Sequence, residues 1–171
     1  QRQMCIRDSD EEAMALHAEA WHAAMPSFHI WGVDTAKWQD RGMLPVDALG
    51  AMVSAAKAGL NALLERGWSL ESAAKLATMR VAIGTDVLSS IALARGARAM
   101  WHRLLSEMGC PNAGALRLEA QTSTLGLHAE GGRDALLSNT VAAYAAVVGG
   151  VDGLEAVSYT HLTLPTSRSG V

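Results

Sequence analysis

Six histidines and two cysteines are the residues in this chain best able to bind a metal or to transfer protons. His17 and His22 are five positions apart, whereas a metal-binding pair on a helix requires a spacing of four. Cys5 and Cys110 lie in neither a Cys-x-x-Cys motif nor a Cys/His ligand set. The sequence therefore predicts no metal site and no catalytic residue, and its isolated thiols favour a reducing cytoplasm.

Polar residues that suit ligand binding follow one segment of the chain. Residues 115–120 alternate between apolar and charged side chains, which is typical of a strand, and Gln121 stands at its end. Ser123 lacks the sequence context of a nucleophile elbow. The glycine-rich loop 124–132 has neither a Gly-Lys-Ser/Thr nor a G-x-G-x-x-G motif. The segment therefore favours binding at the end of a strand over a nucleophile or a phosphate-binding loop.

The elements that must position these residues alternate between strands and helices. Short apolar or alternating runs predict strands at 28–33, 79–84, 115–120 and 153–156. Helical periodicity and capping residues predict helices at 10–24, 46–66, 70–77, 87–108 and 133–149. This alternation predicts the α/β class and a partial (β/α)8 TIM-type barrel with parallel strands, with a doubly wound open sheet as the alternative. A complete barrel takes roughly 250 residues, so 171 residues form only part of one.

The predicted helix 87–108 follows Asp86, whose carboxylate can cap its first turn. Arg95, Arg98 and Arg103 recur along it at helical spacing. In a barrel such a helix lies on the outside, so we expect a solvated or inter-subunit role for these arginines and not phosphate binding.

The composition excludes two classes of partner. The net charge is −3, with acidic and basic residues mixed along the chain, which gives no basic surface for nucleic acid or for an anionic membrane. No apolar run is long enough to span a bilayer. We therefore expect no nucleic acid and no membrane among its partners.

The two ends share an unusual relation at the level of DNA. Residues 5–8 read CIRD and residues 157–160 read VSYT. CIRD back-translated as TGT-ATA-AGA-GAC has the reverse complement GTC-TCT-TAT-ACA, which encodes VSYT. Inverted copies of one element at both ends are typical of read-through into a sequencing adapter. We therefore expect artefactual tails at 1–9 and 157–171, and a fragment of a barrel domain at 10–156.

Four stretches carry a resemblance to one protein family. They are MRVAIGTDVLSSIALARGARAMW at 79–101, LRLEAQTS at 116–123, NTVAAYAAVVGGVD at 139–152, and Val33, Asp34 and Gly42 with Trp38 between them. In this order and at this spacing, residues 27–156 resemble the barrel of the methylmalonyl-CoA mutase family, and most closely its small non-catalytic subunit.

The resemblance implies a barrel that holds an acyl-CoA along its axis, with adenosylcobalamin at its mouth in catalytic chains. There the cofactor starts a radical rearrangement of the carbon skeleton, and the protein binds, orients and shields the reactants. Gln121 and Asp40 match positions that face the cofactor, so the resemblance implies cofactor binding for them. Arg117 and Ser123 match the same strand motif, and the resemblance implies substrate binding. No cobalt-ligand motif, Asp-x-His-x-x-Gly, occurs in this chain, so the cofactor would be held by the complex.

Two departures distinguish this chain from catalytic members. Lys37 stands where catalytic chains have the histidine that contacts the substrate carbonyl, and Gln39 stands at the histidine position of the small subunit. Leu76 and Thr78 stand at the positions of an arginine and a serine. A leucine cannot pair with a CoA phosphate or carboxylate.

The resemblance therefore implies a non-catalytic small subunit that pairs with a catalytic mutase large subunit, with acyl-CoA as a candidate ligand. Two alternatives remain. One is a divergent catalytic acyl-CoA mutase, and the other is an acyl-CoA-binding barrel without radical chemistry. Fold alone does not choose among the three.

Overall fold

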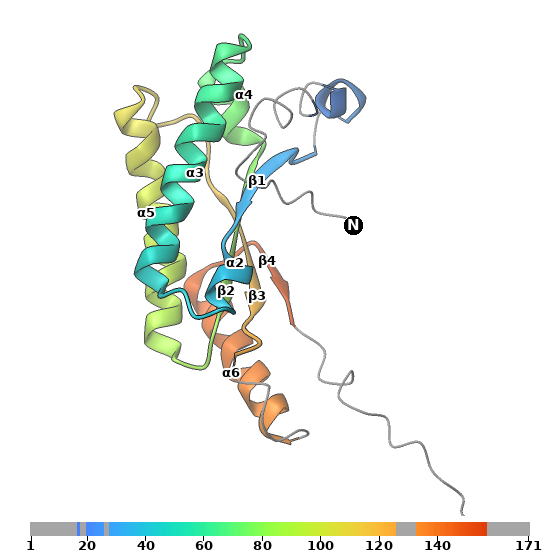
Figure 1. The fold of residues 1–171 in the computed structure, drawn as a ribbon, viewed down its shortest axis with the longest axis vertical. Helices are drawn as coiled ribbons and strands as arrows, with labels where there is room; N and C mark the ends of the chain where they lie inside the picture. Colours follow the sequence, from blue (N-terminus) through green and yellow to red (C-terminus); the bar gives the residue numbers. More distant parts are fainter. Residues whose placement is uncertain (1–16, 18–19, 26–27, 126–132, 157–171) are drawn as a thin grey trace, which may run out of the picture.

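A computed structural model describes residues 17, 20–25, 28–125 and 133–156 (Figure 1). Its elements in chain order are β1 (Trp31–Asp34), α2 (Ala36–Gln39), α3 (Pro45–Glu65), α4 (Leu70–Lys75), β2 (Ala77–Ile83), α5 (Val87–Glu107), β3 (Arg117–Thr122), α6 (Arg133–Gly149) and β4 (Gly153–Glu155). Residues 20–24 are helical. The rest of the predicted helix 10–24 and both predicted tails lie outside the described residues.

The four strands form one parallel sheet in the order β1-β2-β3-β4. Each strand pairs with the next strand of the chain, so the sheet never reverses its direction of growth. A doubly wound sheet requires such a reversal, whereas a barrel adds each strand beside the one before it. The α/β class and the arc of a TIM-type barrel are therefore confirmed.

The core lies between the sheet and one layer of helices. Helix α3 packs beside α5, and α5 packs beside α6. Figure 1 shows α3 and α5 together along one side of the strands. The strand residues that face this layer are fully buried, namely Met79, Val81, Ile83, Leu118, Ala120 and Thr122. Because side chains alternate along a strand, the residues between them face the other side of the sheet.

Capping residues set the ends of the helices, as the sequence predicts. The Asp86 side chain accepts a hydrogen bond from the Ser89 backbone N–H at the start of α5, and Ser69 does the same for Ser72 at the start of α4. Helix α3 ends before Gly67, whose φ of +86° is a conformation that L side chains rarely adopt.

Two predicted strands begin too early. The strand predicted from residue 28 begins at Trp31, because Trp31 pairs with Ala77, the first residue of β2. The residues of α4 precede β2, so residues 28–30 have no strand to pair with in the part of the chain that the structure describes. The strand predicted from residue 115 likewise begins at Arg117, which pairs with Thr78.

Among the residues that the structure describes, no helix combines the length and the apolar character needed to cross a bilayer.

Candidate functional site

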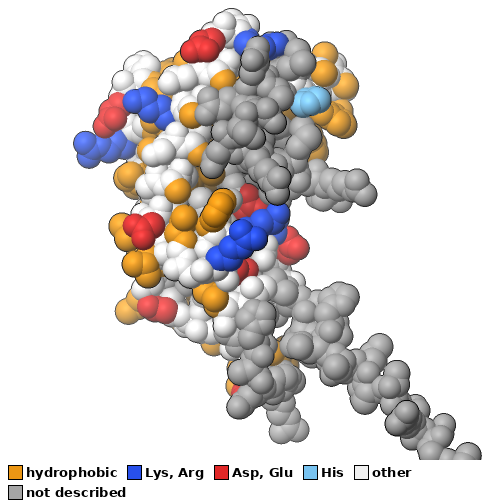
Figure 2. Space-filling view, in the orientation of Figure 1, with side chains coloured by type: hydrophobic (Ala, Val, Ile, Leu, Met, Phe, Trp, Pro, Cys, Tyr) orange, Lys and Arg blue, Asp and Glu red, His pale blue; other side chains and the backbone are white. Residues whose placement is uncertain are grey.

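The face of the sheet opposite the helices carries small, polar and charged side chains. We call it the inner face, because it would line the axis of a complete barrel. Its residues are Gly32, Asp34, Thr78, Arg80, Ala82, Arg117, Glu119, Gln121, Gly153 and Glu155. Figure 2 shows basic and acidic side chains lying together over the strands. Barrels packed shut along their axis are filled by Val, Ile and Leu, so this set is better suited to contact a polar ligand.

Arg80, Gln121 and Glu155 form a connected group across β2, β3 and β4. Arg80 Nη2 donates to Gln121 Oε1 over 2.9 Å, and the same nitrogen donates to Glu155 Oε2. Gln121 is the register partner of both Ala82 and Glu155. The group lies toward the carboxyl ends of the strands, the end at which TIM barrels build their sites.

Asp40 and Ser123 meet at the same end of the sheet. Asp40 Oδ1 accepts from the Ser123 hydroxyl at 2.8 Å and from the Thr124 backbone N–H at 3.0 Å. Ser123 Oγ also accepts from the Leu125 backbone N–H at 3.2 Å. These contacts tie the end of α2 to the end of β3. Since the Ser123 proton is donated to Asp40, the pair mainly shapes the rim of the sheet.

Arg117 lies apart from the other three predicted site residues. It begins β3, four residues before Gln121, which places it roughly 13 Å away along the strand. Its Nε donates to Glu119 Oε1 at 3.3 Å on the same face. The structure thus brings Gln121, Asp40 and Ser123 to one end of the strands, and leaves Arg117 at the other.

Gln39 has a structural role that its position in the sequence does not reveal. The side chain is buried, its Nε2 donates to the Ala82 carbonyl at 3.1 Å, and its Oε1 accepts from the Ala82 N–H at 2.9 Å. The Thr35 hydroxyl donates to the same Oε1 at 3.3 Å. The amide therefore completes the backbone hydrogen bonding of β2 near its carboxyl end, and both of its polar atoms are engaged there.

Gln39→Leu is expected to lower the free energy of unfolding by about 2 kcal/mol, because it leaves a buried N–H and C=O of Ala82 without partners. Urea unfolding measures the change. Lys37→Ala, on the exposed side of the same helix, serves as the control and should change stability by less than about 0.5 kcal/mol. Equal effects of the two variants would contradict the structural role of the amide.

His29 precedes β1 and is a titratable residue whose environment opposes charge. Its burial and the nearby Arg117 hold its pKa below the ordinary value of 6.5, against smaller opposing contributions from Ala77, Glu119 and Asp152. Its Nδ1 is buried without a hydrogen-bond partner within the described part of the chain. A protonated imidazole is therefore disfavoured in the folded protein.

The lowered pKa of His29 predicts a pH-dependent stability. At His29 the unfolded chain binds a proton more readily than the folded one. The contribution of the neutral imidazole to the free energy of unfolding is therefore fully present above the ordinary pKa of 6.5, and it is lost as the pH falls below that value. Urea midpoints measured between pH 7.5 and 5 test this. His29→Gln should flatten the profile, whereas His102→Gln, on the exposed surface of α5, should leave it unchanged.

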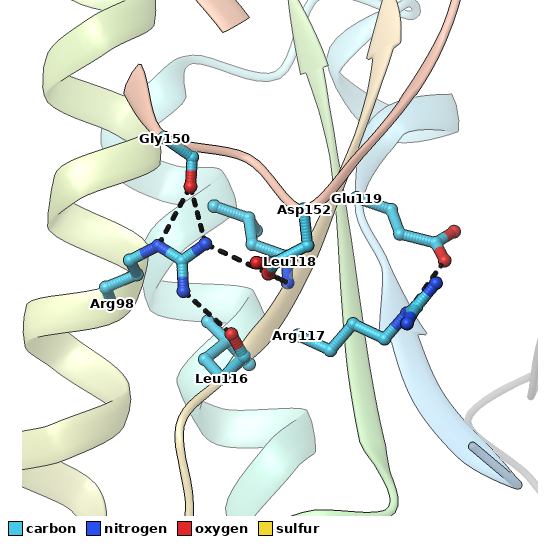
Figure 3. Close-up of polar contacts among 7 residues, drawn as sticks. All are labelled: Arg98, Leu116, Arg117, Leu118, Glu119, Gly150 and Asp152. Atoms are coloured by element: carbon cyan, nitrogen blue, oxygen red, sulfur yellow. Dashed lines mark hydrogen bonds and ion pairs between the residues drawn. The ribbon is translucent and has the colours of Figure 1, made fainter. Parts of the chain in front are cut away.

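Arg98 of α5 connects the helix layer to the strands that carry Gln121 and Glu155 (Figure 3). It donates to the carbonyls of Leu116 and Gly150 and to the Asp152 carboxylate at 2.9 Å. Asp152 Oδ2 in turn accepts from the Leu118 N–H at 2.7 Å. The guanidinium of Arg98 thus has a role within the chain that the sequence did not predict, and its side chain remains 32% exposed.

Sequence reasoning missed Arg80 and Glu155 as members of the site. The available signal was the alternation within the strands. Arg80 alternates with the apolar Met79 and Val81, and this places it on the same face as Gln121 once the strands pair. The partners of a strand residue depend on the neighbouring strand. The contact between Arg80 and Gln121 could therefore be identified only from the register of the sheet.

The described residues contain no cluster of three or more His, Cys, Asp or Glu side chains that could hold a metal ion. Cys110 forms no disulfide within the described ranges. The site can therefore donate and accept hydrogen bonds, but its described residues offer no metal centre.

Comparison with known proteins gives one consistent family. The Methylmalonyl-CoA mutase family profile matches residues 8–170. The chain is 32% identical to the methylmalonyl-CoA mutase small subunit of Streptomyces virginiae over 141 residues, which is 82% of this chain and 23% of that protein. It is 32% identical to a probable methylmalonyl-CoA mutase small subunit of Mycobacterium tuberculosis (strain ATCC 25618 / H37Rv) over 83% of this chain and 23% of the relative.

The name of a more distant relative does not specify a subunit. The methylmalonyl-CoA mutase of Escherichia coli (strain K12) is 26% identical over 154 residues, which is 88% of this chain and 22% of that protein. The chain thus spans less than a quarter of the length of each of these curated relatives.

Proposed function

The chain belongs to the methylmalonyl-CoA mutase family, and we propose that it forms one arc of the barrel of a non-catalytic small subunit in an adenosylcobalamin-dependent acyl-CoA mutase. The observation that carries the proposal is the 32% identity to proteins named as small subunits over more than four fifths of the chain. Its partner would be the catalytic large subunit, and the complex would interconvert the carbon skeletons of acyl-CoA esters.

The residues at the positions where catalytic chains have polar contacts support this assignment. Lys37 is exposed on α2, and Leu76 is buried and apolar. The neighbouring Gln39 has its amide occupied by Ala82. Leu76 has no donor and the Gln39 amide is engaged by Ala82, while Lys37 replaces the imidazole with an ammonium, so the set of contacts that the resemblance requires for a substrate carbonyl and a CoA phosphate is incomplete. A subunit that supports a catalytic partner has no need of those donors.

The inner face fits a peripheral contact with adenosylcobalamin and not a bond to its cobalt. It contains amide, carboxylate and guanidinium groups but no histidine among its described residues. When bound, adenosylcobalamin supplies a carbon radical to the complex. Gln121 would donate a hydrogen bond to a ligand at the mouth, and Asp40 would hold the rim that surrounds it. A reducing cytoplasm would suit Cys110, which has no disulfide in the described part of the chain.

Co-expression of the full-length protein with a catalytic mutase chain tests the proposal. We expect the two to co-purify as a complex, and we expect isomerase activity only when the catalytic chain is present. Failure to form any complex, or activity of the full-length protein by itself with adenosylcobalamin, would overturn the assignment as a non-catalytic subunit.

A divergent catalytic chain is the second candidate, favoured by the position of Gln121 and by the 26% identity to the Escherichia coli mutase. It predicts turnover of an acyl-CoA by the full-length protein without a partner. The same activity assay therefore separates the two candidates.

A further inference from the structure

We propose that α6 is an interior helix of the full-length protein, and that the segment covering its exposed apolar side is a part of the same polypeptide that follows β4. The inference goes beyond the proposed function. It concerns what α6 contacts, and it holds equally for a small subunit and for a catalytic chain.

Helix α6 is apolar on both of its sides. Small residues form the side that packs on α5 and the sheet, and Gly149 approaches α5 so closely that an added Cβ would lie 2.8 Å from the Ala94 Cβ. Large apolar side chains form the other side, and they are 38% to 70% exposed. The buried set is Ala135, Ala142, Ala145 and Ala146, and the exposed set is Leu136, Leu137, Tyr144, Val147 and Val148.

The exposed side of α6 also lacks charge. No charged residue occurs between Asp134 and Asp152, which is the length of the helix after its first turn. At 3.6 residues per turn, Leu137, Tyr144 and Val148 fall in one row along the helix. A helix that is apolar all round is typical of a protein interior, and an apolar surface of this extent marks a contact.

Helix α5 shows what an outer helix of this arc presents to water. It has α3 on one flank and α6 on the other, so its exposed residues are those that flanking helices leave uncovered. They include Arg95, Arg103 and Glu107. Since α6 has no such residues, a neighbouring helix on its second flank does not by itself account for its composition. Its outer side must be covered as well.

The order of the elements indicates where the cover comes from. Helices α3, α5 and α6 follow one another in the same order as the strands, so a strand and helix that come after β4 would lie beside β4 and α6. Within the described ranges β4 pairs with β3 alone. The chain matches only 23% of the small subunit of Streptomyces virginiae and 22% of the Escherichia coli mutase. A full-length protein of that size has enough further polypeptide to cover both the second flank and the outer side of α6.

Thiol labelling of the full-length protein, expressed without a catalytic chain, tests the proposal. Leu137→Cys and Val147→Cys place a thiol on the exposed side of α6, and Arg103→Cys on α5 is the matched control at a side chain that is 78% exposed. Reaction with N-ethylmaleimide is followed by peptide mass spectrometry, which separates each introduced thiol from Cys110. We expect both α6 thiols to react at least about tenfold more slowly than the control, because their modification requires local opening.

Three results would overturn the inference. Labelling of the α6 thiols at the rate of the control would show that this side faces water. Protection that is lost on dilution would assign it to a second copy of the chain, and protection that arises only when a catalytic chain is added would assign it to that partner. Failure to pair with a catalytic chain would contradict the proposed function and leave these labelling rates unchanged.

Discussion

Gly32→Ala is expected to disrupt the pairing of β1 with β2 and to lower the free energy of unfolding by at least about 3 kcal/mol. A Cβ at residue 32 would lie 2.1 Å from the carbonyl oxygen of Thr78 and 3.0 Å from its carbonyl carbon. Both are backbone atoms of the strand that pairs with Gly32, so neither can move without breaking the register. The only remedy is to separate the strands, and that costs hydrogen bonds of the sheet.

Gly50→Ala is the matched control for this prediction. Gly50 lies within α3, and a Cβ added there would meet nothing within 4 Å. Alanine is favoured over glycine inside a helix, so this variant should gain about 1 kcal/mol. Urea unfolding of both variants measures the two changes. A loss of less than about 1 kcal/mol for Gly32→Ala would mean that β1 does not approach β2 as closely as the structure has it.

The behaviour of Gly32 illustrates which features a sequence reveals and which it does not. The order of strands and helices was predictable because it depends on local periodicity, and the parallel arc follows from that order. The need for glycine at position 32 depends on a strand that begins 45 residues later, and no local pattern carries that information.

The residues of the site likewise divide into those that a local pattern predicts and those that depend on distant parts of the chain. Gln121 and Ser123 were predictable as polar residues at the end of a strand, because strand ends in a barrel face its mouth. Their partners were not, since Arg80 is 41 residues from Gln121 and Asp40 is 83 residues from Ser123. Gln39 stood out only as a departure from the family pattern, and the structure shows that its amide substitutes for a neighbouring strand.

Arg98→Met is expected to cost about 3 kcal/mol, although the residue lies on an outer helix and is partly exposed. Methionine keeps much of the apolar bulk but removes the donors to Leu116, Gly150 and Asp152. The loss exceeds that of an ordinary surface ion pair, because three acceptors on two connected segments lose their partner together. Urea unfolding measures it.

Two further variants decide whether this cost comes from the contacts of Arg98 with Leu116, Gly150 and Asp152. Arg103→Met, on the same helix, breaks an exposed pair with Glu107 and should change stability by less than about 0.5 kcal/mol. Asp152→Asn weakens the acceptor shared by Arg98 and the Leu118 N–H. Its effect should be smaller in the Arg98→Met background, with a coupling energy of about 1 kcal/mol. If the stability losses of Arg98→Met and Asp152→Asn simply add, the two residues act separately. Another contact would then have to hold the segment before β4 in place.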